Sequence, residues 1–201
     1  MTGAAPLRPD VASVRILLEG ARALGGPYGT TLELCILTLC LPWEAVAIDV
    51  AEIDWSAGCV TVPARGGTRR ILHLPPEAIR TIMRIAGTAG GSGQAVTAGR
   101  GRPLGHSDVR LDRMQDRLAV AAPRTIELPP WNFHGLRAAA TDELVARGCN
   151  RRSVDQALGL KAPGSRTVAV GAIRTGHDDF EAAAVVIGRW NAVLAERPKM
   201  R

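Results

Sequence analysis

Several features common in other classes of protein are missing from this chain. No apolar run approaches the ~20 residues that span a bilayer, and no charged segment followed by an apolar one marks a secretion signal. The four cysteines show no CxxC spacing, and we expect reduced, packed thiols without disulfides or a metal site. The glycine-rich stretch 88–105 lacks the spacing of a nucleotide-binding loop. These absences predict a cytoplasmic protein that needs neither a metal nor a cofactor.

Lysine is also scarce, because Lys161 and Lys199 are the only lysines among 25 basic residues. The chain carries a formal net charge of +6, and nearly all of its cations are arginines, which grip phosphate groups with two parallel hydrogen bonds. This balance permits a polyanionic partner. A genome-wide bias toward arginine would produce the same excess.

Apolar periodicity and punctuation by proline and glycine predict a mostly helical chain. With 201 residues, 46% of them hydrophobic, we expect one domain over residues 9–201 after a loose segment 1–8. The predicted helices cover residues 9–24, 30–41, 42–48, 76–86, 107–122, 132–147, 151–159 and 178–195. Two β-rich segments, 59–63 and 69–74, predict a small antiparallel sheet with a glycine turn, and 168–170 returns to the core. The fold class is therefore α+β, mostly α-helical, with one small antiparallel sheet.

The helix predicted over 132–147 has an unusual first turn. Asn132 is a good N-cap, but His134 and Arg137 follow it, and no acidic residue appears before Asp142. His134 and Arg137 are three residues apart and share one face, where free backbone N–H groups also favour negative charge. This arrangement predicts an anion site, most simply for a phosphate. The alternative is a surface arginine and a core histidine that happen to be neighbours.

The predicted hairpin turn is basic on both sides. Arg65 precedes the glycines, and Arg69 and Arg70 follow them. A hairpin tip carrying these side chains could reach a backbone phosphate. The alternative is a solvated loop whose arginines have no specific partner.

Five short motifs, taken in order, resemble the catalytic domain of the tyrosine recombinase or phage integrase family. They are residues 37–44 (LTLCLPWE), 53–58 (IDWSAG), 74–78 (LPPEA), 134–137 (HGLR) and 156–160 (QALGL). The similarity covers roughly residues 9 to 195. It implies a helical domain that binds double-stranded DNA. It also implies strand cleavage and rejoining through a phosphotyrosyl intermediate, with cationic side chains and a histidine stabilising the phosphate.

The residues at the family's active-site positions imply a degenerate site. The first family arginine falls at Leu41, the second histidine or tryptophan at Leu160, and the nucleophilic tyrosine at or near Ala169. The hairpin lysine falls at Arg65, which keeps the charge but is a poor proton donor because its pKa stays above ~12. Tyr28 is the only tyrosine, and it lies far from the position that the chemistry needs.

We therefore predict a catalytically inactive, integrase-like DNA-binding protein that modulates recombination or integration. Losing a single preorganised donor typically costs ~2.7 to 4 kcal/mol of transition-state stabilisation, and here several positions are lost together. The predicted DNA contacts are Arg65, Arg69, Arg70, His134 and Arg137. Only about eight residues precede the first helix, where the family usually carries a core-binding domain, so we expect weak, salt-sensitive binding.

Two other functions stay open. Residues 178–196 carry an apolar stripe that could pair with a second copy or with an active recombinase, unless it folds back on its own core. Residual recombinase activity is the third hypothesis.

Overall fold

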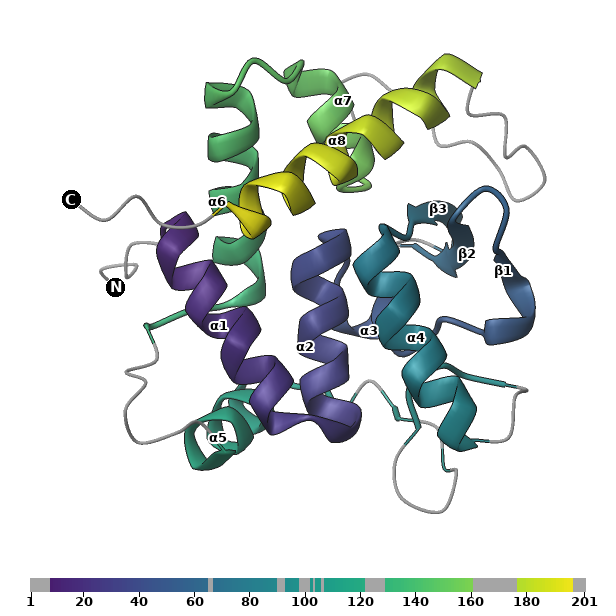
Figure 1. The fold of residues 1–201 in the computed structure, drawn as a ribbon, viewed down its shortest axis with the longest axis vertical. Helices are drawn as coiled ribbons and strands as arrows, with labels where there is room; N and C mark the ends of the chain where they lie inside the picture. The colour runs from purple at the N-terminus through teal and green to yellow at the C-terminus, as the bar shows by residue number, and fades with distance from the viewer. Residues whose placement is uncertain are drawn as a thin grey trace.

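The computed structural model describes residues 8–64, 67–89, 93–97, 102, 104–105, 107–121, 129–160 and 177–196. The predictions made for residues 1–7 and 168–170, and those made for Arg65 and Ala169, lie outside these ranges. Within them, helices make up most of the fold and a small sheet lies at one side of the molecule, which confirms the predicted fold class (Figure 1). No helix in this part of the chain is long and apolar enough to cross a membrane.

The N-terminal helices form the centre of the molecule, where α2 (Gly26–Thr38) lies between α1 (Val11–Leu24) and α4 (Pro76–Ala89) in Figure 1. From Gly29 to Thr38 every residue of α2 is buried. At Gly29 a Cβ atom would collide with the Ala21 carbonyl oxygen, so glycine allows α1 and α2 to approach closely. The short helix α3 (Pro42–Ala45) follows, and Glu44 accepts a hydrogen bond from the Leu41 N–H at 2.7 Å.

The sheet has the order β1–β2–β3, and both pairings are antiparallel. A 3₁₀ turn, η1 (Val50–Glu52), leads into β1 (Ile53–Asp54), which is followed by β2 (Cys59–Pro63) and β3 (Arg69–His73). Val60 pairs with Leu72, and both side chains are buried. Successive side chains in a strand point to opposite faces, so Arg69 is exposed while Arg70 reaches toward the interior.

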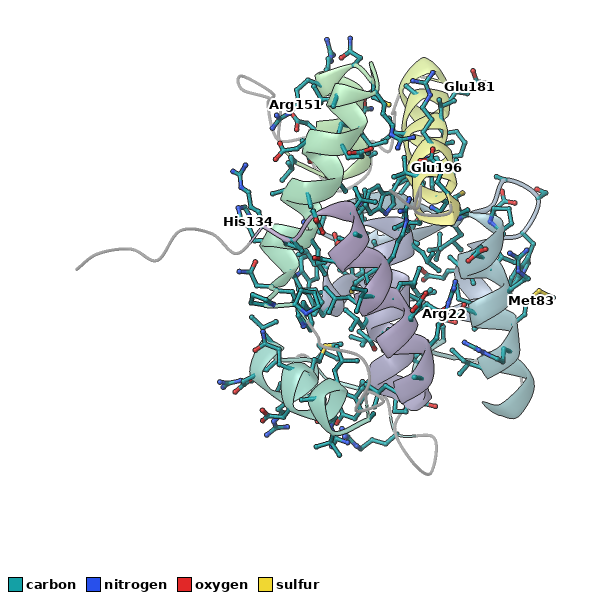
Figure 2. All side chains as sticks on the ribbon, turned by 60° about the vertical axis from the view of Figure 1, so that its left-hand side comes forward. Arg22, Met83, His134, Arg151, Glu181 and Glu196 are labelled. Carbon is teal, nitrogen blue, oxygen red and sulfur yellow. The ribbon has the colours of Figure 1, made fainter. Side chains whose placement is uncertain are left out.

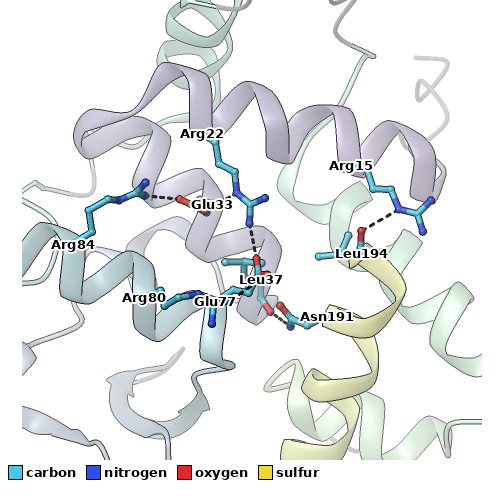
Figure 3. A network of polar contacts seen from close by, with 9 residues as sticks. All are labelled: Arg15, Arg22, Glu33, Leu37, Glu77, Arg80, Arg84, Asn191 and Leu194. Carbon is cyan, nitrogen blue, oxygen red and sulfur yellow. Dashed lines mark hydrogen bonds and ion pairs between the residues drawn. The ribbon is translucent and has the colours of Figure 1, made fainter. Parts of the chain in front are cut away.

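The later helices are α5 (Leu111–Ala121), α6 (Phe133–Ala146), α7 (Arg151–Ala157) and α8 (His177–Ala195). In Figure 1, α5 lies at one end of the molecule and α7 at the other. An ion-pair network fixes the outer side of the central helices, where the buried Glu33 of α2 accepts hydrogen bonds from Arg22 at 2.8 Å and Arg84 at 3.1 Å (Figure 3). Arg22 also donates to Glu77 at 2.6 Å, which joins α1, α2 and α4.

The C-terminal helix α8 packs against its own chain. Its buried residues are Ala183, Val186, Ile187, Trp190 and Val193. The Trp190 indole N–H donates to the Ile36 carbonyl at 2.7 Å, and the Asn191 amide donates to the Leu37 carbonyl at 2.8 Å. Both acceptors lie in the last turn of α2, whose carbonyls lack partners within the helix. Most of the apolar stripe predicted for pairing is thus covered by the chain's own core, whereas Val185 is 55% exposed.

The far end of α8 is tied to α1. Arg15 donates to the carbonyls of Val193 at 2.5 Å and Leu194 at 3.2 Å, which satisfies the free carbonyl groups of the last helical turn (Figure 3).

Candidate anion site

Helix α6 positions the two residues of the His-x-x-Arg motif. The Asn132 side chain accepts a hydrogen bond from the Gly135 N–H at 2.6 Å, which confirms the predicted N-cap and starts the helix at Phe133. His134 is exposed on the outer side of α6 (Figure 2). Arg137 is half-buried, and its guanidinium donates to the Leu158 carbonyl. The motif therefore presents one accessible imidazole and one arginine that turns toward the end of α7.

A buried ion pair lies in the same region. Arg70 donates from Nε to Glu44 Oε1 at 2.7 Å and from Nη2 to Glu44 Oε2 at 2.9 Å. The Arg70 side chain is 11% exposed and the Glu44 side chain 4%. A third hydrogen bond, from Arg70 Nη1 to the Ala157 carbonyl at 3.2 Å, connects this pair to α7.

The C-terminal end of α7 is consequently held by two arginines. Arg70 donates to the Ala157 carbonyl and Arg137 to the Leu158 carbonyl. These consecutive carbonyls lie at the end of α7, where no following helical N–H group is available to bond them. Gly159 makes the approach of Arg70 feasible, because a Cβ atom there would lie 2.6 Å from Arg70 Cδ. Its φ of +64° also lies in the left-handed region that favours glycine.

The charges of this cluster act on one another. Burial lowers the pKa of Arg137, the charge of Arg70 lowers it further, and Glu44 opposes both effects. Burial also raises the pKa of the Cys35 thiol, with further contributions from Cys40 and Glu44, while Arg137 opposes the rise. Arg137 is therefore a desolvated cation with a second cation nearby.

The other predicted contacts are distributed differently. Arg69 is exposed and donates to Glu52 at 2.5 Å, on the face of β3 opposite to Arg70. Leu41 is half-buried at the start of α3, next to Glu44, and Leu160 is exposed just after α7. The structure thus brings Arg70 together with Arg137, leaves His134 on the surface, and directs Arg69 elsewhere.

Two residues of the cluster carried no site prediction from the sequence. Glu44 follows a long apolar run and is an acidic residue in a segment otherwise expected to be buried, a pattern that indicates a paired carboxylate. Gly159 gave no signal of its own, because its closeness to Arg70 depends on the tertiary fold.

Most described arginines elsewhere are neutralised by acidic residues. Arg8, Arg22, Arg80, Arg84, Arg102, Arg110, Arg113, Arg147 and Arg151 each contact a carboxylate. Arg137 contacts none in the part of the chain that the structure describes, and the same is true of Arg15, Arg117, Arg152 and Arg189.

The cysteines agree with the expectation of packed thiols. All four are free, with Cys35, Cys40 and Cys149 buried and Cys59 partly exposed. Within the described ranges, no group of three or more histidine, cysteine or acidic side chains is arranged to hold a metal ion.

Solved structures with the same arrangement of elements define the class of fold. The XerA recombinase structure superposes with a TM-score of 0.63 at 13% identity, over 98% of this chain and 67% of that one. The integrase of mycobacterium phage Brujita gives 0.62 at 16% identity, over 98% of this chain and 66% of that one. A lambda integrase tetramer bound to a Holliday junction gives 0.59 at 17%, over 83% of this chain and 50% of that one. The fold is that of a tyrosine recombinase catalytic domain, and the chain spans about two thirds or less of these proteins.

The family model described as "Phage integrase family" matches residues 17–165, which is most of the chain. This protein belongs to the phage integrase family. A comparison with curated protein sequences finds no significant match.

Proposed function

We propose that this member of the phage integrase family binds double-stranded DNA through a backbone phosphate at Arg137 and does not cut the strand. The observation that carries the proposal is the half-buried Arg137 guanidinium, which contacts no carboxylate among the described residues. A desolvated cation without a counter-ion is unfavourable, and a phosphate oxygen would supply the missing negative charge. The solved relatives include lambda integrase on a Holliday junction and on a core site, which makes DNA the natural source of that phosphate.

His134 supports the same interpretation. It lies on α6 three residues before Arg137 and is exposed, so that its side chain can reach a ligand without any rearrangement of the core. Net charge adds a general attraction, since the chain carries +6 at neutral pH.

The proposed inactivity rests on the missing groups. Tyr28 is the only tyrosine, and its ring lies under the Arg117 guanidinium of α5 at 3.9 Å. Leu41 and Leu160 stand at two of the family's active-site positions, and both lie within the described residues. Their aliphatic side chains supply neither a charge nor a proton. A protein of this composition would hold DNA and modulate recombination by an active relative at the same site.

Binding is tested by fluorescence anisotropy with a duplex of about 30 base pairs at about 50, 100 and 200 mM salt. We expect affinity to fall steeply with salt, and Arg137→Ala to bind about tenfold more weakly because a charge-assisted hydrogen bond is lost. His134→Ala provides a second variant whose exposed position spares the fold. The matched control is Arg110→Ala, which removes an exposed arginine already paired with Asp112. Equal affinities for Arg137→Ala and Arg110→Ala would contradict the proposed phosphate site.

Cleavage is tested separately with a nicked suicide duplex that traps a covalent protein–DNA adduct. We expect no adduct under conditions in which an active tyrosine recombinase is quantitatively trapped. An adduct that disappears in Tyr28→Phe, or that maps to any hydroxyl of this chain, would overturn the proposed inactivity.

Pairing through residues 178–196 has less support. These residues include the buried side of α8, and a partner could use that surface only if α8 left its place on α2. The lambda integrase structures are a tetramer and a dimer on DNA. Assembly of this chain on DNA would have to use surfaces other than the buried side of α8.

A further inference from the structure

Arg70 stands out because its side chain is fully engaged although it lies in the predicted DNA-binding hairpin. Its Nε and Nη2 donate to Glu44, its Nη1 donates to the Ala157 carbonyl, and only 11% of the side chain is exposed. A guanidinium that is bonded on these sides has little capacity left for a phosphate. Any contribution of Arg70 to DNA binding must therefore come through the residues that it contacts.

Glu44 is the neighbour that matters most. Its carboxylate is 4% exposed, and Arg70 is the cation whose nitrogens contact it in the described part of the chain. The Leu41 N–H also donates to it, but the Leu41 side chain offers no charge. Without Arg70, a buried carboxylate would be left facing the cluster with no cation of its own.

Arg137 is the next cation within reach. Arg70 and Arg137 bind adjacent carbonyls, Ala157 and Leu158, which places both guanidinium groups at the same end of α7. Glu44 and Arg70 also act in opposite directions on the pKa of Arg137, which shows that all three charges interact. A Glu44 carboxylate released from Arg70 would attract the Arg137 guanidinium and occupy the donors that a phosphate needs.

We infer that Arg70 is a positioning residue of the anion site: by neutralising Glu44, it keeps the Arg137 guanidinium available for a DNA phosphate. The inference takes its ligand, a DNA phosphate, from the proposed function. The electrostatic arrangement of Arg70, Glu44 and Arg137 rests only on their contacts. Gly159 supports this arrangement, because only a residue without a Cβ atom leaves room for the Arg70 side chain next to it.

The decisive experiment compares Arg70→Met with the double variant Glu44→Gln/Arg70→Met, using a duplex of about 30 base pairs in low salt. Arg70→Met leaves Glu44 unpaired, and we expect about a tenfold loss of affinity. The double variant has the same net charge as the natural protein and no carboxylate to capture Arg137, so we expect affinity within about threefold of the natural protein. Arg69→Met is the matched control, because it removes a neighbouring exposed arginine paired with Glu52. We expect it to lose no more than about threefold.

Two results would overturn the inference. A double variant as weak as Arg70→Met would mean that Arg70 acts through its own contacts, with DNA or with α7, and not by neutralising Glu44. An Arg70→Met variant no weaker than Arg69→Met would mean that Glu44 does not capture Arg137. Circular dichroism melting confirms that each variant is folded. Should Arg70→Met fail to fold, Arg70→Gln replaces it, because its amide can still donate to Glu44 while carrying no charge.

A second readout separates this inference from the proposed function. The arginine Nε–Hε signals of the protein without DNA report the surroundings of Arg137 directly. We expect the Arg137 signal to shift in Arg70→Met and to return toward its original position in the double variant, whether or not the natural protein binds DNA. An Arg137 signal that is unchanged in Arg70→Met overturns the inference, while absent DNA binding with a shifting signal overturns only the proposed function.

Discussion

The attachment of α8 to the end of α2 can be tested at a single side chain. Trp190 is completely buried, and its indole N–H is bonded to the Ile36 carbonyl at 2.7 Å. Trp190→Phe keeps an aromatic ring but leaves that carbonyl without its donor, which costs about 1 to 3 kcal/mol. The smaller ring also leaves a void that adds about 1 kcal/mol. We therefore expect Trp190→Phe to lower the free energy of unfolding by about 2 to 4 kcal/mol, and Trp190→Ala by about 5 kcal/mol.

Urea denaturation followed by far-ultraviolet circular dichroism measures these losses, provided that the slope of the transition is unchanged. Trp55→Phe is the control, because Trp55 is 45% exposed and its replacement should change stability by less than about 0.5 kcal/mol. Light scattering over a range of protein concentrations accompanies the melts. A Trp190→Phe variant as stable as the natural protein, or a stability that rises with protein concentration, would refute the packing of α8 on its own chain.

Three further predictions concern the site and its supports. Burial and the charge of Arg70 lower the pKa of His73 to about 4 from 6.5, so the stabilising contribution of the neutral ring is complete above pH 6.5 and is lost as the pH falls toward 4. Between pH 7 and 5 the natural protein should lose about 1 to 2 kcal/mol more stability than His73→Leu in urea melts. Gly159→Ala should cost about 1 to 3 kcal/mol, because φ is +64° and the new Cβ would meet Arg70; a thermal melt that matches the natural protein would contradict this. Asn132→Ala should lose about 1 kcal/mol through the missing N-cap, whereas the exposed His134→Ala should stay within about 0.5 kcal/mol in the same melts.

The helices were predictable because their buried faces repeat regularly and their ends carry strong signals. Asn132 caps α6 as predicted, and the helix ends at Ala146, two residues before Gly148 with its positive φ of 82°. The first helix ends at Leu24 as predicted, but the predicted start of the second helix at residue 30 is wrong, because α2 begins at Gly26. Pro27 fits the first turn of a helix, where its missing N–H has no partner to lose.

The other ends of elements moved for similar local reasons. The central helix was predicted to reach Leu41, but it ends at Thr38 because Leu39 turns into the left-handed region with φ of 56°. The helix predicted over 107–122 starts only at Leu111, and the one predicted over 42–48 is limited to Pro42–Ala45. Boundaries of this kind depend on single turns, which periodicity does not resolve.

Spacing alone was enough to select His134 and Arg137 as candidate site residues, because both lie on one helix. The pairing of Arg70 with Glu44 joins residues 26 positions apart, on different elements, and no local pattern encodes it. Strand alternation does predict that Arg69 and Arg70 face opposite ways, yet it cannot tell which of the two meets the core.

The bond from Arg15 to the end of α8 joins helices near opposite ends of the sequence, 178 positions apart. During synthesis, α1 and α2 are complete long before the side chains of α8 leave the ribosome. Until then the Ile36 and Leu37 carbonyls and the surface that receives Trp190 stay open to other contacts. A newly made chain thus exposes this surface to proteases and to aggregation until α8 has emerged and packed against α2.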